Sequence, residues 1–542
     1  MAIETTKRTQ QRKHPLAAGS EKERDRLAAV PEEPTPFHSV LYKEPAPAPD
    51  GIEPPAFFAD LHLDQIVKTI TIGRSQYRLE PFFYAPLHDV DAIKYRQEVM
   101  RDLDDKELFG LVTAFAHKLD TMRGYLSQAE KFYYKYQKER LFLDAADLYR
   151  EAVGTLWRGL SETAIRSRGF LGFREFLSGY AQSQDFTALV ADIHQLKTEL
   201  ASVQYTFLIK GNRVTVRKYE GEKDFTADIE ETFERFRQRS VKDYRVTLPD
   251  RLEMNHVEAK ILDLVAELYP EVFSRLDAFR SDHDHFEDET ISRFDREIEF
   301  YVAYLEHTAR FIERGLSFCI PSISTSKGVQ AYDAFDLALA DVLATKNENI
   351  VCNDFSLKGQ ERVIIVTGPN QGGKTTFARM FGQMLFLGSL GCPVPGRDAK
   401  LFLFDRLLTH FEKEEDIRDL SGKLQDDLVR MRDIFAHTTP ESVIIINEIF
   451  TSTTAQDALF LSRKIMQDIL RKGCLVVWVT FVEELAALGE TVVSMVGTVD
   501  PEDPVVRTFR IERRPADGLA YAKAIAEKYR LTYNQLKERI RT

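Results

Sequence analysis

One glycine-rich segment of the chain has residue types and spacing suited to binding phosphate groups. It fits the pattern G-x-x-x-x-G-K-[ST] and consists of Gly368, Pro369, Asn370, Gln371, Gly372, Gly373, Lys374 and Thr375, followed by Thr376. Glycines let backbone N–H groups approach phosphate oxygens. The Lys374 ammonium suits the β- and γ-phosphates, and the Thr375 hydroxyl suits Mg²⁺. The segment predicts a site for a nucleoside triphosphate and Mg²⁺.

The residues on either side of this loop favour the same interpretation. The apolar run 363–366 predicts a buried strand before the loop, and residues 375–387 predict a helix after it. A strand, a glycine loop and a helix N-terminus together form a phosphate cradle. This context favours a nucleotide site over a merely structural glycine turn.

A second apolar run, residues 442–446, ends in Asn447 and Glu448. Acidic residues at such a strand end lie beside the metal in P-loop NTPases. An ionised Glu448 could deprotonate the attacking water, so Glu448 and Lys374 are the predicted catalytic residues. Thr375 and Asn447 are the predicted metal ligands. Because an amide keeps the oxygen acceptor but lacks the charge of the usual aspartate, we expect weaker metal binding and slower turnover.

The rest of the chain divides into four predicted parts. Residues 1–55 are polar and then proline-rich, which is typical of a flexible tail. Residues 56–334 show apolar residues at helical spacing and predict a helical domain, interrupted by a β-hairpin near 203–217. Residues 335–516 alternate strands and helices and predict an α/β domain with a mainly parallel sheet. Residues 517–542 predict two short helices, 519–529 and 533–540, with Thr532 as an N-cap.

The composition of the 542 residues excludes some classes of protein. No apolar run approaches the roughly 20 residues that a membrane span needs, and the polar N-terminus lacks the core of a signal peptide. Four separated cysteines fit a reducing compartment, so a cytoplasmic location is expected. The net charge of −12 gives no global sign of nucleic-acid binding. Lys210, Arg213, Arg217 and Lys218 on the hairpin could contact a phosphate backbone or only solvate an edge.

Several motifs in a fixed order resemble the MutS mismatch-repair ATPases. Besides the glycine loop, they are Asn353-Asp354, Val394-Pro395, 405–409 (DRLLT), 447–457 (NEIFTSTTAQD), 480–485 (TFVEEL) and the closing stretch 518–540. Upstream, residues 86–103 resemble the opening of the family's helical core. The resemblance covers about residues 56–542.

The resemblance implies a helical core and lever domain, then an ABC-type P-loop NTPase domain and a C-terminal helix-turn-helix that dimerises. It implies a homodimer in which Ser421 and Gly422, in the signature segment 421–428, complete the partner's ATP site. It also implies action on DNA. No counterpart of the mismatch-recognition or connector domain is found, so the chain is expected to be a truncated paralogue that does not recognise mismatches.

Three functions remain open from the sequence. The first is an ATPase that acts as a dimer on DNA, and the second is an ATP-dependent scaffold for a protein or ribonucleoprotein partner. The third is an ATP-binding switch with little hydrolysis, suggested by Asn447 and by Phe481, which replaces the family's usual histidine. Phe481 is expected to be a core aromatic residue, and His410 a surface residue.

Overall fold

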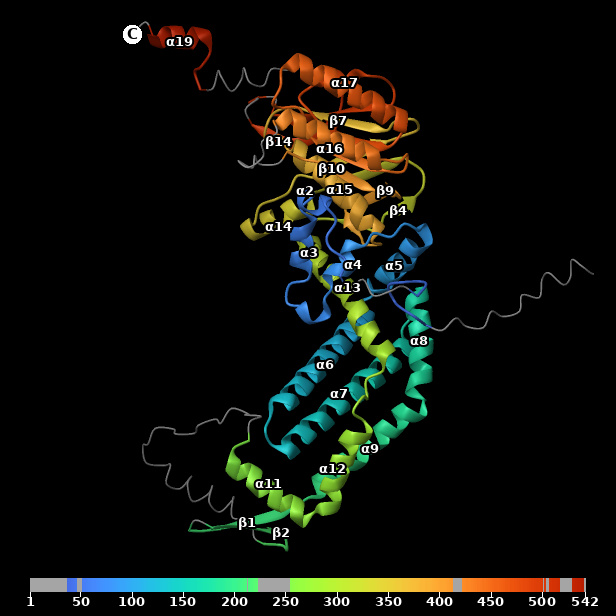
Figure 1. The fold of residues 1–542 in the computed structure, drawn as a ribbon, viewed down its shortest axis with the longest axis vertical. Coiled ribbons are helices and arrows are strands. Elements are labelled where there is room, and N and C mark those ends of the chain that lie inside the picture. Colours follow the sequence, from blue (N-terminus) through green and yellow to red (C-terminus); the bar gives the residue numbers. More distant parts are fainter. Residues whose placement is uncertain are drawn as a thin grey trace, which may run out of the picture. The chain divides into compact units, whose positions relative to one another are not determined.

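The computed structural model describes residues 37–45, 51–211, 213–222, 254–412, 422–500, 502–503, 506–516 and 529–540. Figure 1 shows a helical region and an α/β region built around parallel strands, which confirms the predicted mixture of α and α/β structure. Three predictions fall wholly or almost wholly outside the described residues, namely those for residues 1–36, for Ser421 and for the helix 519–529.

The helical region consists of long helices joined by short links. Its elements are α2 (Phe57–Asp60), α3 (Leu63–Ile70), η1 (Ser75–Tyr77), α4 (Glu80–Tyr84), α5 (Val90–Asp102), α6 (Lys106–Lys131), α7 (Lys135–Glu162), α8 (Arg168–Ala181), α9 (Gln184–Ser202), α11 (His256–Leu268), α12 (Pro270–Asp282) and α13 (Glu289–Ile312). The predicted hairpin is present as β1 (Tyr205–Lys210) and β2 (Arg213–Lys218), which pair antiparallel. Helices α6 and α7 pack along each other (Figure 1).

The prediction that residues 1–55 are a tail is wrong for residues 39–41, which are buried. The Glu297 carboxylate on α13 accepts hydrogen bonds from the Ser39 hydroxyl at 2.7 Å and the Val40 N–H at 2.9 Å. The buried Arg96 guanidinium donates to the Leu41 carbonyl at 3.0 Å. Proline-rich composition near this segment concealed it, because the polar partners that hold it come from distant helices.

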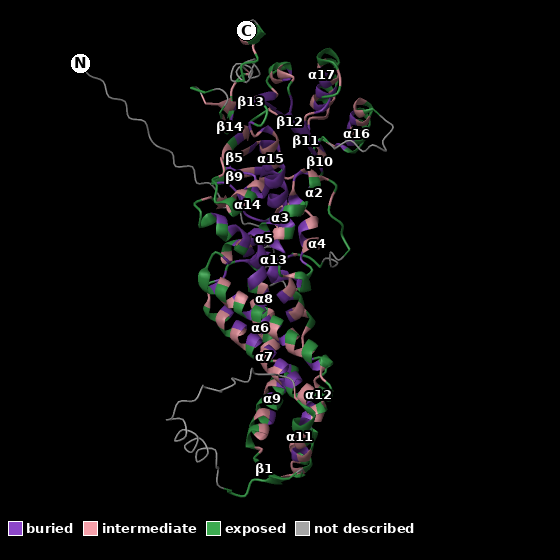
Figure 2. Cartoon of the chain, turned by 90° about the vertical axis from the view of Figure 1, so that its left-hand side faces the viewer, coloured by how far each residue is buried: buried purple, intermediate pink, exposed green. Residues whose placement is uncertain are grey.

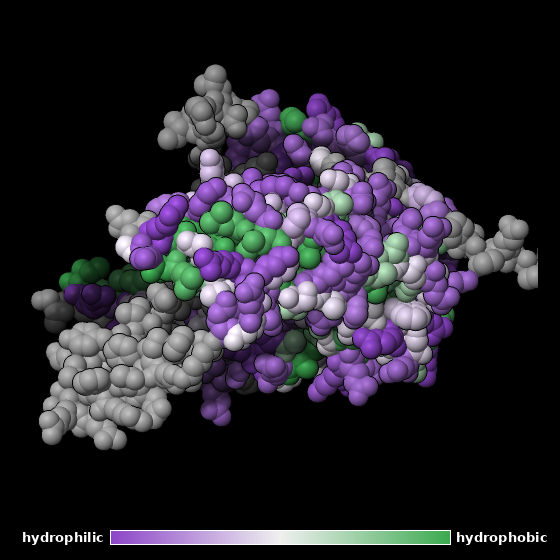
Figure 3. Space-filling view, turned by 90° about the horizontal axis from the view of Figure 1, so that it is seen from below, coloured by the Kyte–Doolittle hydropathy of each residue, from purple (hydrophilic) through white to green (hydrophobic). Residues whose placement is uncertain are grey.

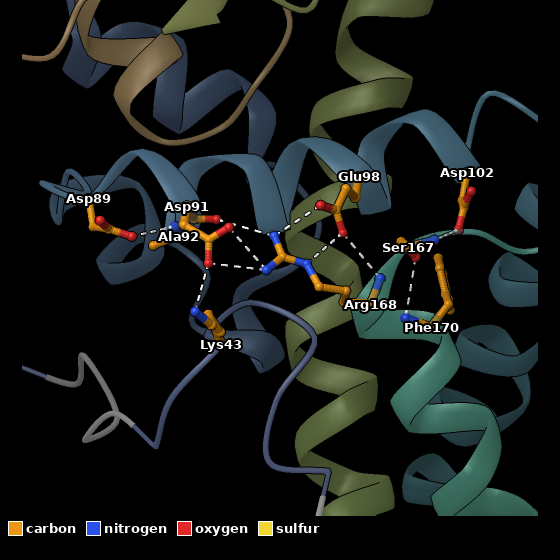
Figure 4. Close-up of polar contacts among 9 residues, drawn as sticks. All are labelled: Lys43, Asp89, Asp91, Ala92, Glu98, Asp102, Ser167, Arg168 and Phe170. Atoms are coloured by element: carbon orange, nitrogen blue, oxygen red, sulfur yellow. Dashed lines mark hydrogen bonds and ion pairs between the residues drawn. The ribbon is translucent and has the colours of Figure 1, made fainter. Parts of the chain in front are cut away.

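A group of ion pairs joins α5 to α8, as Figure 4 shows. The Arg168 guanidinium at the start of α8 contacts the carboxylates of Asp91 and Glu98 on α5, and the Lys43 ammonium reaches Asp91 at 2.7 Å. The Asp102 carboxylate accepts the Ser167 N–H at 2.7 Å. These contacts fix the described N-terminal segment, α5 and α8 to one another.

The α/β region contains a six-stranded sheet in the order β10-β11-β12-β7-β13-β14. Its strands are β7 (Val363–Thr367), β10 (Leu407–His410), β11 (Val443–Asn447), β12 (Leu475–Val479), β13 (Val492–Val499) and β14 (Arg507–Arg513). The first five run parallel, and only β14 is antiparallel to its neighbour. The strands predicted at 363–366 and 442–446 are confirmed, with shifts of one residue.

Helices cover both faces of this sheet, which explains why its central strands are apolar throughout. Helix α15 (Lys374–Ser389) packs against β11 and β12 on one face. Helices α16 (Lys423–His437) and α17 (Ala455–Lys472) share an apolar core with β7, β11 and β12 on the other face. Figure 2 shows buried residues concentrated in this sheet and around α15. The sheet is therefore a rigid base for the residues at its strand ends.

A smaller sheet, β4-β9-β5-β6, shows that the predicted domain boundary at 334/335 is misplaced. Its strands are β4 (Ser322–Ser324), β5 (Val329–Ala334), β6 (Asn353–Leu357) and β9 (Asp398–Phe402). Strand β5, which precedes the boundary, pairs with both β6 and β9 behind it. The remaining elements of the region are β3 (Phe318–Cys319), α14 (Leu337–Lys346), β8 (Val394–Pro395) and η2 (Glu483–Ala487).

The described part of the C-terminal segment holds one helix, α19 (Tyr533–Ile540), as predicted. Thr532 precedes it, and its backbone N–H and hydroxyl both bond to the Gln535 side chain, which is one half of a capping box. Among the described residues, no helix is both long and apolar enough to cross a bilayer.

Candidate nucleotide-binding site

The glycine loop joins β7 to α15, as the sequence predicts. Gly368 has a φ of 121°, and a Cβ atom there would lie 2.8 Å from the Gly497 backbone nitrogen on β13. Gly373, with a φ of 90°, is the N-cap of α15. Only glycine fits these two positions without strain, because the first needs close backbone approach and both need a left-handed conformation. The loop therefore places free N–H groups of the α15 N-terminus beside the strand ends.

Lys374, the first residue of α15, directs its ammonium into this loop and is only 4% exposed. The Nζ atom donates to the carbonyls of Gly368 and Pro369, both at 3.1 Å, and to the Asn370 side-chain oxygen at 3.4 Å. Burial lowers the pKa of Lys374, and the nearby Glu448 carboxylate opposes that shift. The ammonium thus occupies a site of oxygen acceptors that phosphate oxygens could replace.

Asn447, the last residue of β11, and Glu448, which follows it, face the loop. The Thr375 hydroxyl donates to the Asn447 side-chain oxygen at 2.9 Å, and a Glu448 oxygen lies 3.9 Å from Lys374 Nζ. Burial raises the pKa of Glu448, while Lys374 opposes that shift. A carboxyl group with a raised pKa, close to the buried lysine of the glycine loop, has the placement and basicity of a candidate general base.

The metal ligands predicted at Thr375 and Asn447 lie side by side, and both offer neutral oxygen atoms. Within the described ranges, no cluster of three or more His, Cys, Asp or Glu residues is arranged to hold a metal ion. Mg²⁺ is commonly held by one or two protein oxygens together with substrate phosphates and water. The residues present fit such a site, in which phosphate would supply the negative charge.

Two expectations about residues near the loop are wrong. Phe481 is not a core residue, since it is 50% exposed, and its ring centroid lies 4.6 Å from Lys374 Nζ. An aromatic face at this distance attracts the ammonium. His410 is not on the surface but fully buried at the end of β10. Its nearest charged partner is Asp427 on α16, at 3.3 Å.

The structure does not assemble every predicted site residue. Gly422 is the exposed N-cap of α16, while Ser421 lies outside the described residues. Pairing of Gly422 with a partner's loop therefore stays a prediction.

Sequence reasoning assigned no structural role to two residues that support the loop, although Asn353 belongs to one of the motifs. Asn353 on β6 accepts the Ile511 N–H at 2.7 Å and donates to the Phe509 carbonyl at 3.2 Å, which fixes β14 beside the loop. Arg507 donates to the Asn370 carbonyl at 3.1 Å. The sequence analysis also assigned no role to Asp427, which lies on the buried face of α16 together with Met431 and Ile434. The helical spacing of these three residues was a signal available in the sequence.

Comparison with known proteins agrees with the resemblance in the α/β region. Residues 364–508 match the family model of MutS domain V. The DNA mismatch repair protein MutS of Thermotoga sp. (strain RQ2) is 31% identical over 144 residues, covering 26% of this chain and 18% of that protein. The protein of the same name from Orientia tsutsugamushi (strain Boryong) is 26% identical over 188 residues, or 34% of this chain and 21% of that protein.

A third relative, the DNA mismatch repair protein MutS of Shouchella clausii (strain KSM-K16), is 26% identical over 249 residues, or 43% of this chain and 28% of that protein. The matches thus span between about a fifth and somewhat more than a quarter of the relatives' length. The family match and these relatives support a MutS-like family for this chain.

Proposed function

We propose that the protein binds and hydrolyses ATP and acts as a homodimer on DNA, without selecting mismatches. The observation that carries the ATP part is the convergence of the Lys374 ammonium, the Thr375 hydroxyl and the Glu448 carboxylate on one glycine loop. Buried, preorganised charges of this kind stabilise phosphoryl transfer without large reorganisation. Thr375 and Asn447 would hold Mg²⁺ together with the phosphates, and the ion would supply positive charge against the charge that develops in the reaction.

The roles of the chain's own groups follow from their positions. The loop N–H groups and Lys374 bind and orient the phosphates. Glu448 receives a proton from the attacking water at its carboxylate oxygen, and its raised pKa favours this transfer. Asn447 supplies an oxygen but no charge, so we propose slower turnover than an aspartate would support.

Calorimetric titration with ATP and Mg²⁺, followed by single-turnover hydrolysis, tests this part. Micromolar or tighter binding with measurable hydrolysis is the expected result, and Lys374→Met is the matched loss-of-charge control. Absence of ATP binding by the wild-type protein would overturn the proposal. Binding without hydrolysis would leave the ATP-binding switch as the function.

The proposal of DNA contact rests on the β1–β2 hairpin. Residues directly opposite each other in an antiparallel pair share a face. The register therefore places Lys210, Arg213 and Arg217 on one face of the hairpin, where all three are exposed. Cations of this kind bind the phosphate backbone through counterion release and read no sequence. This arrangement agrees with binding that ignores mismatches.

The opposite face of the same hairpin favours a second candidate function, a scaffold that binds a protein partner. Tyr205, Phe207 and Ile209 lie on this face and are 43%, 49% and 68% exposed. Apolar surface is visible in Figure 3, which looks from below Figure 1, the side on which the hairpin and α11 lie. Exposed apolar patches often mark protein interaction sites.

Competition binding to matched and mismatched duplexes of equal length, over a range of salt concentrations, separates the two candidates. The DNA proposal expects equal affinity for both duplexes and steep weakening with salt. A preference above about tenfold for the mismatch, or about 1.4 kcal/mol, would contradict it. Failure to bind either duplex at low salt would favour the scaffold.

The homodimer is tested by light scattering at micromolar concentration, with and without ATP. A two-fold assembly that tightens with ATP is the expected result. A monomer under both conditions would refute this part of the proposal.

A further inference from the structure

A buried aspartate on α16 has no part in the site described above. Asp427 is 7% exposed and lies one and two helical turns before Met431 and Ile434, which are also buried. Met431 and Ile434 pack in the apolar core that covers one face of the main sheet. Since a buried carboxylate is costly without partners, the contacts of Asp427 indicate what it does.

Both carboxylate oxygens of Asp427 face the strand ends of the sheet. One oxygen accepts the backbone N–H of Phe450 at 3.1 Å. The other lies 3.3 Å from Nε2 of His410, the last residue of β10. Asp427 therefore joins three elements: α16, the end of β10 and the turn that follows β11.

That turn carries the proposed base. Glu448 and Phe450 have φ values of 53° and 63°, a left-handed conformation that non-glycine residues adopt only when neighbouring contacts hold it. The Glu448 N–H donates to the Val479 carbonyl at 3.0 Å, which fixes the start of the turn. The Phe450 side chain is buried in the apolar core, and its N–H is held by Asp427. The Asp427 bond thus restrains the far end of the turn.

Two further contacts tie α16 to the end of β10. Arg430 on α16 donates to the Phe411 carbonyl at 2.8 Å, and Lys423 at the start of α16 forms an ion pair with Glu412. The Glu412 carboxylate also accepts a long hydrogen bond from the hydroxyl of Thr451, the residue after Phe450, at 3.5 Å. Helix α16 therefore contacts the turn directly through Asp427 and indirectly through residues 411 and 412 at the end of β10.

We propose that Asp427 is a positioning residue for hydrolysis, which holds the Glu448–Phe450 turn so that the Glu448 carboxylate stays directed at the glycine loop. The inference rests on the proposed function, because it assumes that Glu448 acts as the base. Asp427 touches neither the loop nor the expected position of the phosphates. Its loss should slow the chemical step and leave ATP binding nearly unchanged.

The test compares two variants without a hydrogen-bond acceptor, Asp427→Ala and Asp427→Leu, with the conservative variant Asp427→Asn. We expect the first two to slow single-turnover hydrolysis by about tenfold or more, a fraction of what a general base contributes. Their ATP affinity should stay within about threefold of wild type, and Asp427→Asn should recover most of the rate because an amide oxygen can still accept the Phe450 N–H. Asp433→Ala, an exposed change on the same helix, is the matched control and should leave rate and affinity unchanged.

A double-variant comparison distinguishes positioning from a merely structural role. In a Glu448→Gln background, Asp427→Ala or Asp427→Leu should slow the residual rate by less than about twofold, because effects that act through one group are not additive. A structural role would reduce the rate equally in both backgrounds and would lower ATP affinity as well.

The outcomes separate this inference from the function on which it rests. A wild-type protein that does not hydrolyse ATP overturns the proposed function. A hydrolysing wild type with wild-type rates in the acceptor-free variants overturns only the role of Asp427. If neither acceptor-free variant folds while Asp427→Asn does, Asp427 is a folding residue and the inference is likewise overturned.

Discussion

The glycine loop and the β1–β2 hairpin both present cations, but they hold them in opposite ways. Lys374 is 4% exposed and lies within hydrogen-bond distance of three oxygen atoms, whereas Lys210, Arg213 and Arg217 are exposed on a two-stranded ribbon. A buried charge acts from one fixed position, in a medium that screens it little. Exposed charges act through their sum and are weakened by salt. Substitutions in the loop should therefore have large and specific effects, whereas substitutions in the hairpin should have small effects that add up.

The largest expected effect comes from removing the proposed base. Glu448→Gln keeps the size of the side chain but cannot accept the proton, so single-turnover hydrolysis should slow by roughly 10²-fold or more. ATP affinity should remain close to that of the wild type, which calorimetry can check. An unchanged rate would show that Glu448 is not the base. It would also show that substitutions beside the glycine loop do not have the large effects that distinguish this region from the hairpin.

A smaller effect is expected from the loop lysine. Lys374→Met keeps the apolar stem and removes the ammonium, so ATP affinity should fall by at least about tenfold, or about 1.4 kcal/mol. Because Lys374 is buried, salt should change this loss little. Equal affinity for ATP in calorimetry would contradict the assignment of the loop.

At the hairpin, the triple change of Lys210, Arg213 and Arg217 to glutamine should weaken duplex binding several-fold and reduce its salt dependence. Log affinity falls with log salt, and each lost phosphate contact makes that slope shallower by about 0.9. Lys218→Gln is the matched control, because Lys218 lies on the opposite face, with its ammonium 4.9 Å from the Tyr269 ring centroid. Hydrolysis without DNA should be unaffected, and a triple variant with wild-type salt dependence would remove the hairpin from the DNA site.

The smallest effect concerns stability in the helical region that carries the hairpin. Burial, together with the neighbouring Asp277 carboxylate, raises the pKa of Glu139 on α7 to about 8. A carboxyl group whose pKa is raised on folding stabilises the fold while protonated, so this contribution is lost as the pH rises from about 4.5 through 8. Glu139→Gln should therefore flatten the pH dependence and raise the melting temperature by a few degrees above pH 8.

The exposed Glu151→Gln change on the same helix is the control, because this carboxylate is 51% exposed and pairs only with Lys118 among the described contacts. It should leave the pH dependence as it is in the wild type. Thermal unfolding followed at several pH values measures both variants. Parallel pH profiles for wild type and Glu139→Gln would contradict the assignment.

The sequence by itself determined the features that depend on neighbouring residues. The strand, glycine loop and helix at 363–389 were predictable because the spacing of glycines and apolar residues encodes the local backbone. The positions of Asn447 and Glu448 at the end of β11 were predictable for the same reason. The hairpin was predictable because apolar and polar residues alternate on both sides of Gly211. The helical pattern of residues 56–334 was recognisable, although its division into separate helices was not.

Only the tertiary structure decided which side chains are buried and what they contact across long sequence separations. It buried residues 39–41 against α13, buried His410 beside Asp427, and exposed Phe481 above Lys374. The pairing of the strands also placed Lys218 on one face of the hairpin and the other three cations on the opposite face. Composition could not reveal these outcomes, because each depends on packing between segments distant in the chain, and the free energy of burial depends on partners that no local pattern names.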